Sequence, residues 1–176
     1  MIDYGQLVKL GPLRKSNLEE YRIARNSIGI RQWCRQTDLI SEEDQIDWYA
    51  NQRTNPTIRM YEIMSKENPG LGLGVCGLTD IDQVNQRAEF SLYILADHRN
   101  NGFGKAALLT LIQHGFNSLN LNSIWGETFE GNPAWSMFVK VGFNLEGTRK
   151  DFYFKKGKFI DCHLYSVQRD TWKTTK

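Results

Sequence analysis

Apolar and polar residues alternate along several short stretches of the chain, which is the pattern of strands with one buried face. The clearest stretch is 57–64, and the apolar run 87–95 ends directly before a polar, glycine-containing segment. Stretch 71–81 contains three glycines, which indicate a bulge or close packing within a strand. We expect strands over residues 6–10, 57–64, 71–81, 87–95, 122–129, about 143–154 and 158–168, the last two joined by a turn at 156–157.

Helical spacing and capping signals occupy the remaining segments. Ser16 with Glu19, and Ser41 with Asp44, form the pattern of a capping box, so we expect helices over about 17–25 and 42–51. In the second helix the apolar positions Ile46, Trp48, Tyr49 and Ala50 are expected to face the sheet. Between these helices, 26–39 is expected to be a bent helical stretch.

Two further helices are expected in the second half of the chain. Residues 105–119 have apolar positions along one broad face. Asn132 as a cap and Pro133 as the first helical residue open a helix that ends before Gly142. The order of strand, helices, antiparallel meander, strand–helix–strand–helix and hairpin predicts a mixed α/β fold with one central sheet, in a single domain spanning 1–176.

Composition excludes several classes of function. The 176 residues carry a net charge of only +2, which argues against nucleic-acid and membrane partners. The first residues lack a basic segment followed by an apolar one, so we expect no signal peptide and a cytoplasmic protein. Cys34, Cys76 and Cys162 are widely spaced, so we expect reduced thiols, with the last two buried, and no metal site.

The segment Arg99-Asn100-Asn101-Gly102-Phe103-Gly104-Lys105-Ala106 joins an apolar strand to the helix at 105–119. Such a loop directs several backbone N–H groups toward one point, where the helix dipole also favours an anion. Gly102 and Gly104 allow positive φ, and Arg99 and Lys105 supply positive charge. Phosphate is therefore the expected occupant.

The alternative is an ordinary strand-to-helix turn, since short glycine motifs often occur by chance. The dinucleotide-binding fingerprint is not met, because Ala107 stands where its third glycine belongs. The P-loop is not met either, because the segment lacks a Gly-Lys-Ser/Thr ending.

Two separate stretches resemble the GNAT superfamily of N-acetyltransferases. Arg99-x-x-Gly102-x-Gly104 is similar to its acetyl-CoA signature, and Asn132 through Gly142-Phe143 is similar to its second conserved stretch. The segments from Cys76 to Phe90, and the last hairpin, look most like the branch of ribosomal-protein N-terminal and spermidine acetyltransferases. Some acetyltransferases of nucleotide-linked amino sugars share this pattern.

The resemblance implies a central, mostly antiparallel, splayed sheet of about six to seven strands flanked by helices. It also implies transfer of an acetyl group from acetyl-CoA, without a metal, to a primary amine of a small molecule: an amino sugar, a sugar nucleotide or a polyamine. The alternatives are a protein N-terminus as the acceptor, or a non-catalytic module that binds acyl-CoA. A homodimer is possible in this family.

The resemblance also assigns residues to the cofactor. The main chain of Tyr93, Ile94 and Leu95 would pair with the pantetheine arm, and Asn132 would contact it near the thiol. Trp135, Phe138 and Lys140 lie on the helix that packs along the cofactor. The pyrophosphate would be held by the loop residues Arg99, Asn100, Asn101, Gly102, Phe103, Gly104 and Lys105.

An alkyl ammonium has a pKa of about 10.4, so a base must remove its proton before attack. We favour Glu89, on the strand that enters the loop, and take Glu127 as the second candidate. The alternative for either is a carboxylate paired with Arg87 or another cation. Many relatives have a tyrosine as the acid for the leaving thiolate where this chain has Phe138, which cannot donate a proton. Either another donor serves, such as Ser136, Tyr93 or a water, or the thiolate leaves unprotonated.

The acceptor site has fewer signals. Trp33 and Trp48 are candidate walls of an acceptor pocket. A polyamine would require several carboxylates, but the acidic residues near 19, 20 and 42–44 are explained by helix capping. Three arginines, Arg25, Arg31 and Arg35, either form an exposed face or, if they meet at the cleft, suit an acidic or phosphate-bearing acceptor.

Overall fold

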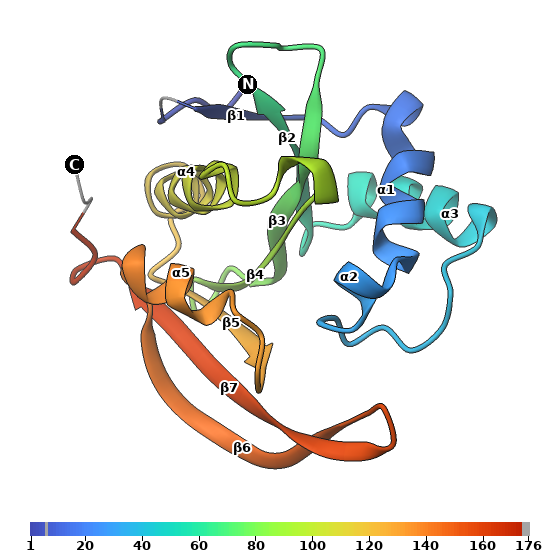
Figure 1. Ribbon diagram of the computed structural model, residues 1–176. Coiled ribbons are helices and arrows are strands. Elements are labelled where there is room, and N and C mark those ends of the chain that lie inside the picture. Colours follow the sequence, from blue (N-terminus) through green and yellow to red (C-terminus); the bar gives the residue numbers. More distant parts are fainter. Residues whose placement is uncertain (6, 174–176) are drawn as a thin grey trace.

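A computed structural model describes residues 1–5 and 7–173 of the chain. Seven strands form one sheet in the order β1-β2-β3-β4-β5-β7-β6, and every neighbouring pair is antiparallel except β4 and β5 (Figure 1). This confirms the predicted mixed, mostly antiparallel sheet. The strands are β1 (Val8–Gly11), β2 (Arg59–Ser65), β3 (Gly72–Asp82), β4 (Arg87–Ile94), β5 (Ser123–Phe129), β6 (Asn144–Lys155) and β7 (Lys158–Gln168). Gln6, placed by the sequence in the first strand, lies outside the described residues.

Helices cover both faces of this sheet: α4 and α5 on one side, and α1, α2 and α3 on the other (Figure 1). Within the described residues, no helix combines the length and apolar character that crossing a bilayer requires. The helical segments are η1 (Lys15–Asn17), α1 (Leu18–Asn26), α2 (Ile28–Arg31), α3 (Glu42–Thr54), η2 (Ala96–His98), α4 (Phe103–Asn117) and α5 (Trp135–Lys140).

The two faces of β4 carry different side chains. Phe90, Leu92 and Ile94 belong to the large core that α4 and α5 cover. Tyr93 belongs to a smaller cluster under α1 and α3. Because strand residues alternate between faces, Glu89 lies on the same face as Tyr93.

Strands β4 and β5 pair over only three residue pairs, and the last of these is Glu89 with Trp125. Beyond it, the ring of Phe90 lies against the backbone of Gly126, where an added Cβ would come within 2.3 Å of the ring. The sheet therefore splays after Glu89. Between Phe90 and Ile94 the edge of β4 that faces β5 has no strand partner.

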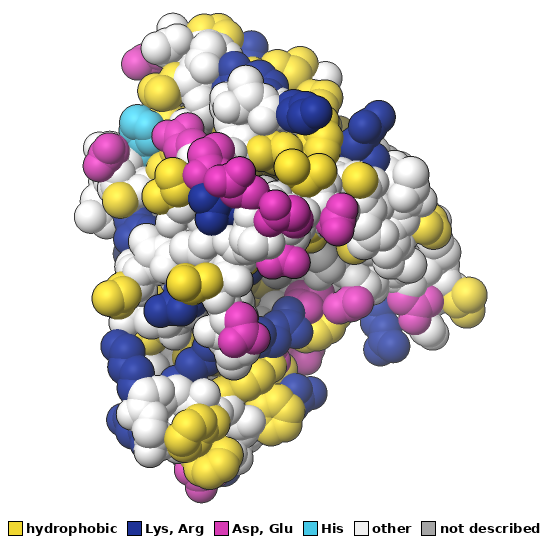
Figure 2. All heavy atoms as spheres, turned by 90° about the vertical axis from the view of Figure 1, so that its right-hand side faces the viewer, with side chains coloured by type: hydrophobic (Ala, Val, Ile, Leu, Met, Phe, Trp, Pro, Cys, Tyr) yellow, Lys and Arg dark blue, Asp and Glu magenta, His cyan; other side chains and the backbone are white. Residues whose placement is uncertain are grey.

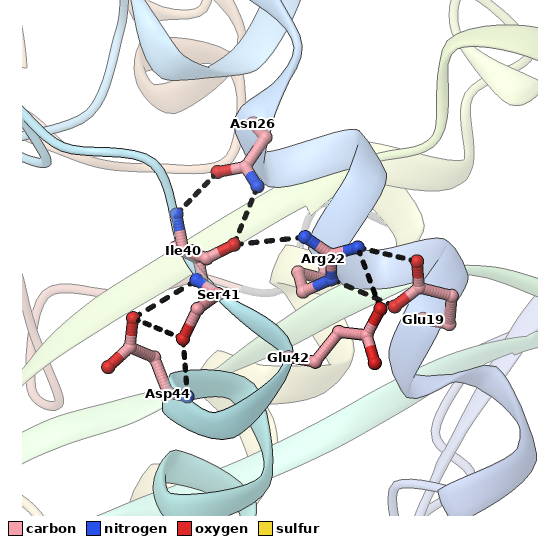
Figure 3. Close-up of polar contacts among 7 residues, drawn as sticks. All are labelled: Glu19, Arg22, Asn26, Ile40, Ser41, Glu42 and Asp44. Atoms are coloured by element: carbon pink, nitrogen blue, oxygen red, sulfur yellow. Dashed lines mark hydrogen bonds and ion pairs between the residues drawn. The ribbon is translucent and has the colours of Figure 1, made fainter.

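One predicted capping box is confirmed and one is wrong. Ser41 and Asp44 make both reciprocal bonds at the start of α3 (Figure 3). Ser16 instead lies in η1, where its hydroxyl bonds to Asn17, and Asn17 precedes α1 without a side-chain cap. Glu19, the expected partner of Ser16, pairs with Arg22 at 2.6 Å.

The buried face of α3 also differs from the prediction. Gln45 and Gln52 are buried, whereas Ile46 is 52% exposed, so the expected contact of Ile46 with the sheet is wrong. Trp48 and Tyr49 do pack against the smaller cluster. Ala50, also expected to face the sheet, is exposed. The stripe toward the sheet is therefore set by positions 45, 48, 49 and 52, and long amide side chains occupy two of them.

The segments around α2 and α5 are less helical than expected. After Asn26, the last residue of α1, only Ile28–Arg31 is helical in 26–39, and the loop after it is anchored to α1 by Asn26 and Arg22, which bond to Ile40 (Figure 3). Asn132 does not cap α5. Its side-chain oxygen accepts from the N–H of Ala134 at 3.0 Å, and the helix starts one residue later.

Candidate active site

The glycine loop leads from η2 into the N-terminus of α4. Gly102 has φ of +79° and Asn100 has φ of +64°, so the chain turns sharply before the helix begins at Phe103. Gly104, which was expected to allow positive φ, does not use that freedom and is an ordinary helical residue of α4. The first N–H groups of α4 have no partner within the helix and are directed out of its N-terminus.

The side chain and carbonyl of Arg99 make hydrogen bonds that stabilise the glycine loop. Its Nε donates to the carbonyl of Ile94 at 3.1 Å, and Asn101 donates to the carbonyl of Arg99 at 3.2 Å. The N–H of Leu95 donates to Leu73 at 2.9 Å. The carbonyl of Ile94 and the N–H of Leu95 are thus occupied, and the open main-chain edge lies over residues 90–93.

Helix α5 presents the residues of the second GNAT-like stretch. Trp135 and Lys140 are exposed. Phe138 is buried, with its ring 5.1 Å from that of Phe90 and 5.8 Å from that of Tyr165. The side chain of Phe138 therefore serves the core, which removes it from the candidate contacts with a cofactor.

The two candidate bases meet at the point where the sheet splays. Arg35, from the loop after α2, lies 2.5 Å from an oxygen of Glu89 and 3.5 Å from an oxygen of Glu127. Both carboxylates are almost completely buried. Both carboxylates therefore have a cation as a partner, as the alternative expected, but that cation is Arg35, whereas Arg87 pairs with Asp82 at 3.5 Å.

These two carboxylates differ in how fully they are bonded. Glu127 accepts from the hydroxyl of Tyr153 and from the thiol of Cys162 at 3.3 Å, and Arg149 lies 3.7 Å away. Glu89 accepts from Arg35 through Oε1 only. Its Oε2 is buried and has no hydrogen-bond partner among the described residues.

Burial raises the pKa of Glu89, and the hydrogen bond from Arg35 offsets only part of this effect. A buried carboxylate with a raised pKa is a stronger base than an exposed one. Burial, followed by the bond to Glu127, raises the pKa of Cys162 to about 12, so this thiol stays protonated. Cys76 is buried as expected, and Cys34 is partly buried.

The tip of the β6–β7 hairpin holds in place the loop whose Arg35 contacts Glu89. The ammonium of Lys155 donates to the carbonyls of Cys34 and Gln36 at 2.5 and 3.2 Å, and Lys156 donates to Gln32 at 2.9 Å. These bonds hold the loop that carries Arg35. None of the hairpin contacts was predicted from the sequence, because more than 110 residues separate the partners.

Comparison with known proteins identifies the family. Residues 8–144 match the model of the acetyltransferase (GNAT) domain. The chain belongs to the GNAT acetyltransferase family. The predicted enzyme class, an acetyl-CoA-dependent N-acetyltransferase, is thereby confirmed.

Relatives and structures agree with this family. The chain is 32% identical over 132 residues to the uncharacterized N-acetyltransferase p20 of Bacillus licheniformis, covering 74% of each chain. It is 24% identical over 172 residues to the spermidine N(1)-acetyltransferase of Escherichia coli K12, covering 93% of this chain and 91% of the relative. Its fold is similar to that of the Vibrio cholerae spermidine N-acetyltransferase crystallised with CoA and spermine, with a TM-score of 0.87, 20% identity, and coverage of 93% and 96%.

Proposed function

We propose that this enzyme transfers the acetyl group of acetyl-CoA to a small-molecule primary amine, with Glu89 as the general base. The observation that carries the proposal is the bare Oε2 of Glu89. It is buried without a partner at the point where β4 and β5 separate. An unsatisfied buried acceptor is costly, and a substrate N–H would satisfy it.

The cofactor is proposed to lie along the open edge of β4. Its diphosphate would sit at the N-terminus of α4, against the N–H groups of Phe103, Gly104 and Lys105, with Arg99 and Lys105 adding positive charge. Asn100, Asn101 and Gly102 shape that turn. The pantetheine arm would then run past Tyr93, Ile94 and Leu95 toward Glu89, with the exposed residues of α5 and its approach, Asn132, Trp135 and Lys140, on the other side.

The ammonium proton would pass to Oε2 of Glu89, and the neutral nitrogen would then attack the thioester carbon. A new C–N bond forms and the C–S bond breaks, which releases the CoA thiolate, while the second nitrogen proton, acidic on the cationic nitrogen of the intermediate, is lost to solvent. Arg35 holds Oε1, so it orients the carboxylate without covering the oxygen that takes the proton.

The leaving thiolate needs no tyrosine at position 138. Thiols have a pKa of about 8.5, roughly two units below that of alkyl ammonium, so the thiolate is a better leaving group than the amine that attacks. Of the other hydroxyls near the expected position, that of Ser136 donates to the carbonyl of Pro133 at 3.1 Å. Release of unprotonated thiolate is thus the proposed route.

The test is a thiol-release assay with acetyl-CoA and a panel of primary amines. Replacing Glu89 with Gln keeps the shape of the side chain but removes the base, so kcat should fall by about 10²- to 10⁴-fold. CoA binding, measured by calorimetry, should stay within about twofold. The matched variant Glu127→Gln, whose carboxylate is already fully bonded, should lower kcat by less than about tenfold.

Equal losses in the two variants would contradict the assignment of Glu89. Binding of CoA without turnover on any amine would instead support the non-catalytic module. A protein N-terminus as acceptor is distinguished by adding short peptides with free and blocked N-termini to the same panel.

A further inference from the structure

A cavity of about 220 Å³ lies between α1, α3 and the sheet, on the face of β4 that carries Glu89. Its walls include Arg25, Asp44, Gln45, Trp48, Met60 and Tyr93. Tyr93 and Glu89 are four residues apart on the same face, which corresponds to about 13 Å along the strand at about 3.3 Å per residue. Between them that face of β4 carries only the small side chain of Ser91.

Arg25 is the cation of this cavity, and it has no counter-ion. Its guanidinium lies 5.7 Å from the centre of the Tyr93 ring, and one terminal nitrogen donates to Gln36 at 3.3 Å. Its Nε is buried and has no hydrogen-bond partner. No carboxylate of residues 1–5 and 7–173 lies within ion-pair distance of Arg25.

Other polar groups around the cavity are also free. The amide of Gln45, the indole N–H of Trp48 and the hydroxyl of Tyr93 make no hydrogen bond within the described part of the chain, and none of these polar atoms is fully buried. The cavity therefore offers two aromatic walls, one unpaired guanidinium nitrogen and three free donors. A ligand that carries hydrogen-bond acceptors would fit such a site.

One carboxylate, that of Asp44, also lines the cavity, and some of the carboxylates nearby are engaged within the protein. Asp44 accepts from the N–H of Ser41 at 3.0 Å and from its hydroxyl at 2.8 Å, at the positive end of the α3 dipole (Figure 3). Figure 2 shows acidic side chains gathered on this face of the molecule, where α1 and α3 each begin with acidic residues. Of these, Glu19 and Glu42 lie 2.6 and 3.9 Å from Arg22.

We infer that this cavity binds an anionic group of the acceptor, so that the substrate is an elongated amine with a carboxylate or phosphate at its far end. The inference rests on the proposed function, which places the amine at Glu89. A polyamine would bring an ammonium group to Arg25, where the two cations would repel each other. Hydrogen bonds to charged groups are worth enough to change affinity about ten- to a hundredfold.

The test uses amines of one length that differ at the far end: aminooctanoate, aminooctyl phosphate, the neutral aminooctanamide and diaminooctane. With saturating acetyl-CoA, kcat/KM for the two anionic amines should exceed that for the amide by about ten- to a hundredfold. The diamine should be the poorest substrate. The carboxylate and phosphate arms show which anion the cavity prefers.

Arg25→Gln should reduce this anion-to-amide ratio to near one, and Arg25→Lys should keep part of it. The matched control is Arg87→Gln, because Arg87 pairs with Asp82 away from the cavity, and it should leave the ratio unchanged. A preference for the diamine, or a ratio that Arg25→Gln does not alter, would overturn the inference.

Calorimetric binding of the same four compounds to the CoA-bound enzyme separates the two proposals. If no amine is acetylated but anionic compounds bind in an Arg25-dependent way, the cavity assignment stands and the proposed function fails. If amines are acetylated in a Glu89-dependent way without any preference for an anion, the cavity assignment alone fails.

Discussion

Two of the carboxylates buried in this sheet, those of Glu62 and Glu89, are bonded very differently. Glu62 on β2 is 0% exposed and Glu89 on β4 is 3% exposed. Glu62 accepts three bonds from Arg14, at 2.6, 2.9 and 3.1 Å, and one each from Asn17 and Tyr21 at 2.7 Å. Glu89 accepts one bond, from Arg35, and keeps a bare oxygen.

The pKa of each group reflects this difference. Burial alone would raise the pKa of Glu62, but the hydrogen bonds from Arg14, Tyr21 and Asn17 outweigh it and the pKa is lowered. For Glu89, burial outweighs its single arginine and the pKa is raised. A carboxylate with every lone pair occupied fixes structure, whereas one left incomplete is available for chemistry.

The largest effect is expected from removing the satisfied carboxylate. Glu62→Ala leaves the guanidinium of Arg14 and the hydroxyl of Tyr21 without their acceptor, and should cost about 3 kcal/mol of unfolding free energy in a urea titration. That figure is the low end of the usual range because Arg14 is 34% exposed. Glu89→Gln, which keeps the shape of the side chain, should cost less than about 1 kcal/mol. Equal costs would remove the distinction between the two sites.

A smaller effect is expected from Arg35→Gln. Because Arg35 holds down the pKa of Glu89, its loss should raise that pKa further and move the acidic limb of the kcat/KM profile to higher pH. At neutral pH the rate should fall by about tenfold, since the loss of one charge-assisted bond is worth at least about 1.4 kcal/mol. Arg149→Gln is the control, because Arg149 lies near Glu127 and not near Glu89. In this variant the acidic limb of the kcat/KM profile should stay in place.

The smallest effect is the pH dependence of stability, and its sign differs between the two sites. The lowered pKa of Glu62 contributes stability above the unfolded value of 4.5, which is lost as pH falls through the folded pKa. As pH falls, the free energy of unfolding of the wild type should therefore approach that of Glu62→Gln, with a slope of no more than about 1.4 kcal/mol per pH unit.

The raised pKa of Glu89 has the opposite consequence. It contributes stability below the unfolded value of 4.5, which is lost as pH rises through the folded pKa. Relative to wild type, Glu89→Gln should be most stable near neutral pH, and the difference should shrink in acid. Urea titrations of both variants at several pH values would check this, and parallel curves would contradict it.

Local pattern was enough to predict all seven strands, whereas the splay that opens the edge of β4 was expected only from the resemblance to the GNAT superfamily. The capping prediction was wrong at Ser16, because Ser16 lies inside η1 and α1 starts only after it. The prediction from local pattern was also wrong at Ile46, because buried glutamines take the positions that face the sheet. Patterns of three or four residues report local structure alone, and both failures arise from tertiary packing.

The candidate site shows the same limit. Glu89 and Glu127 were named from their places on strands, and both lie at the splay, but their catalytic roles and the cofactor contacts stay predictions. For Arg35 and two other arginines the sequence left two alternatives, an exposed face or the cleft. Its partner Glu89 lies 54 residues away in the chain. Tyr153 and Arg149 were missed, because their contacts with Glu127 depend on how the last hairpin curves back across the sheet.

The bonds from Lys155 and Lys156 to the loop that carries Arg35 have a consequence for biosynthesis. A chain growing on the ribosome contains the whole glycine loop and β1 to β4 long before the hairpin tip has been made. The half of the enzyme assigned to the cofactor is thus complete in sequence first. The loop that carries Arg35 is held in place last, because Lys155 and Lys156 are among the last residues to be made.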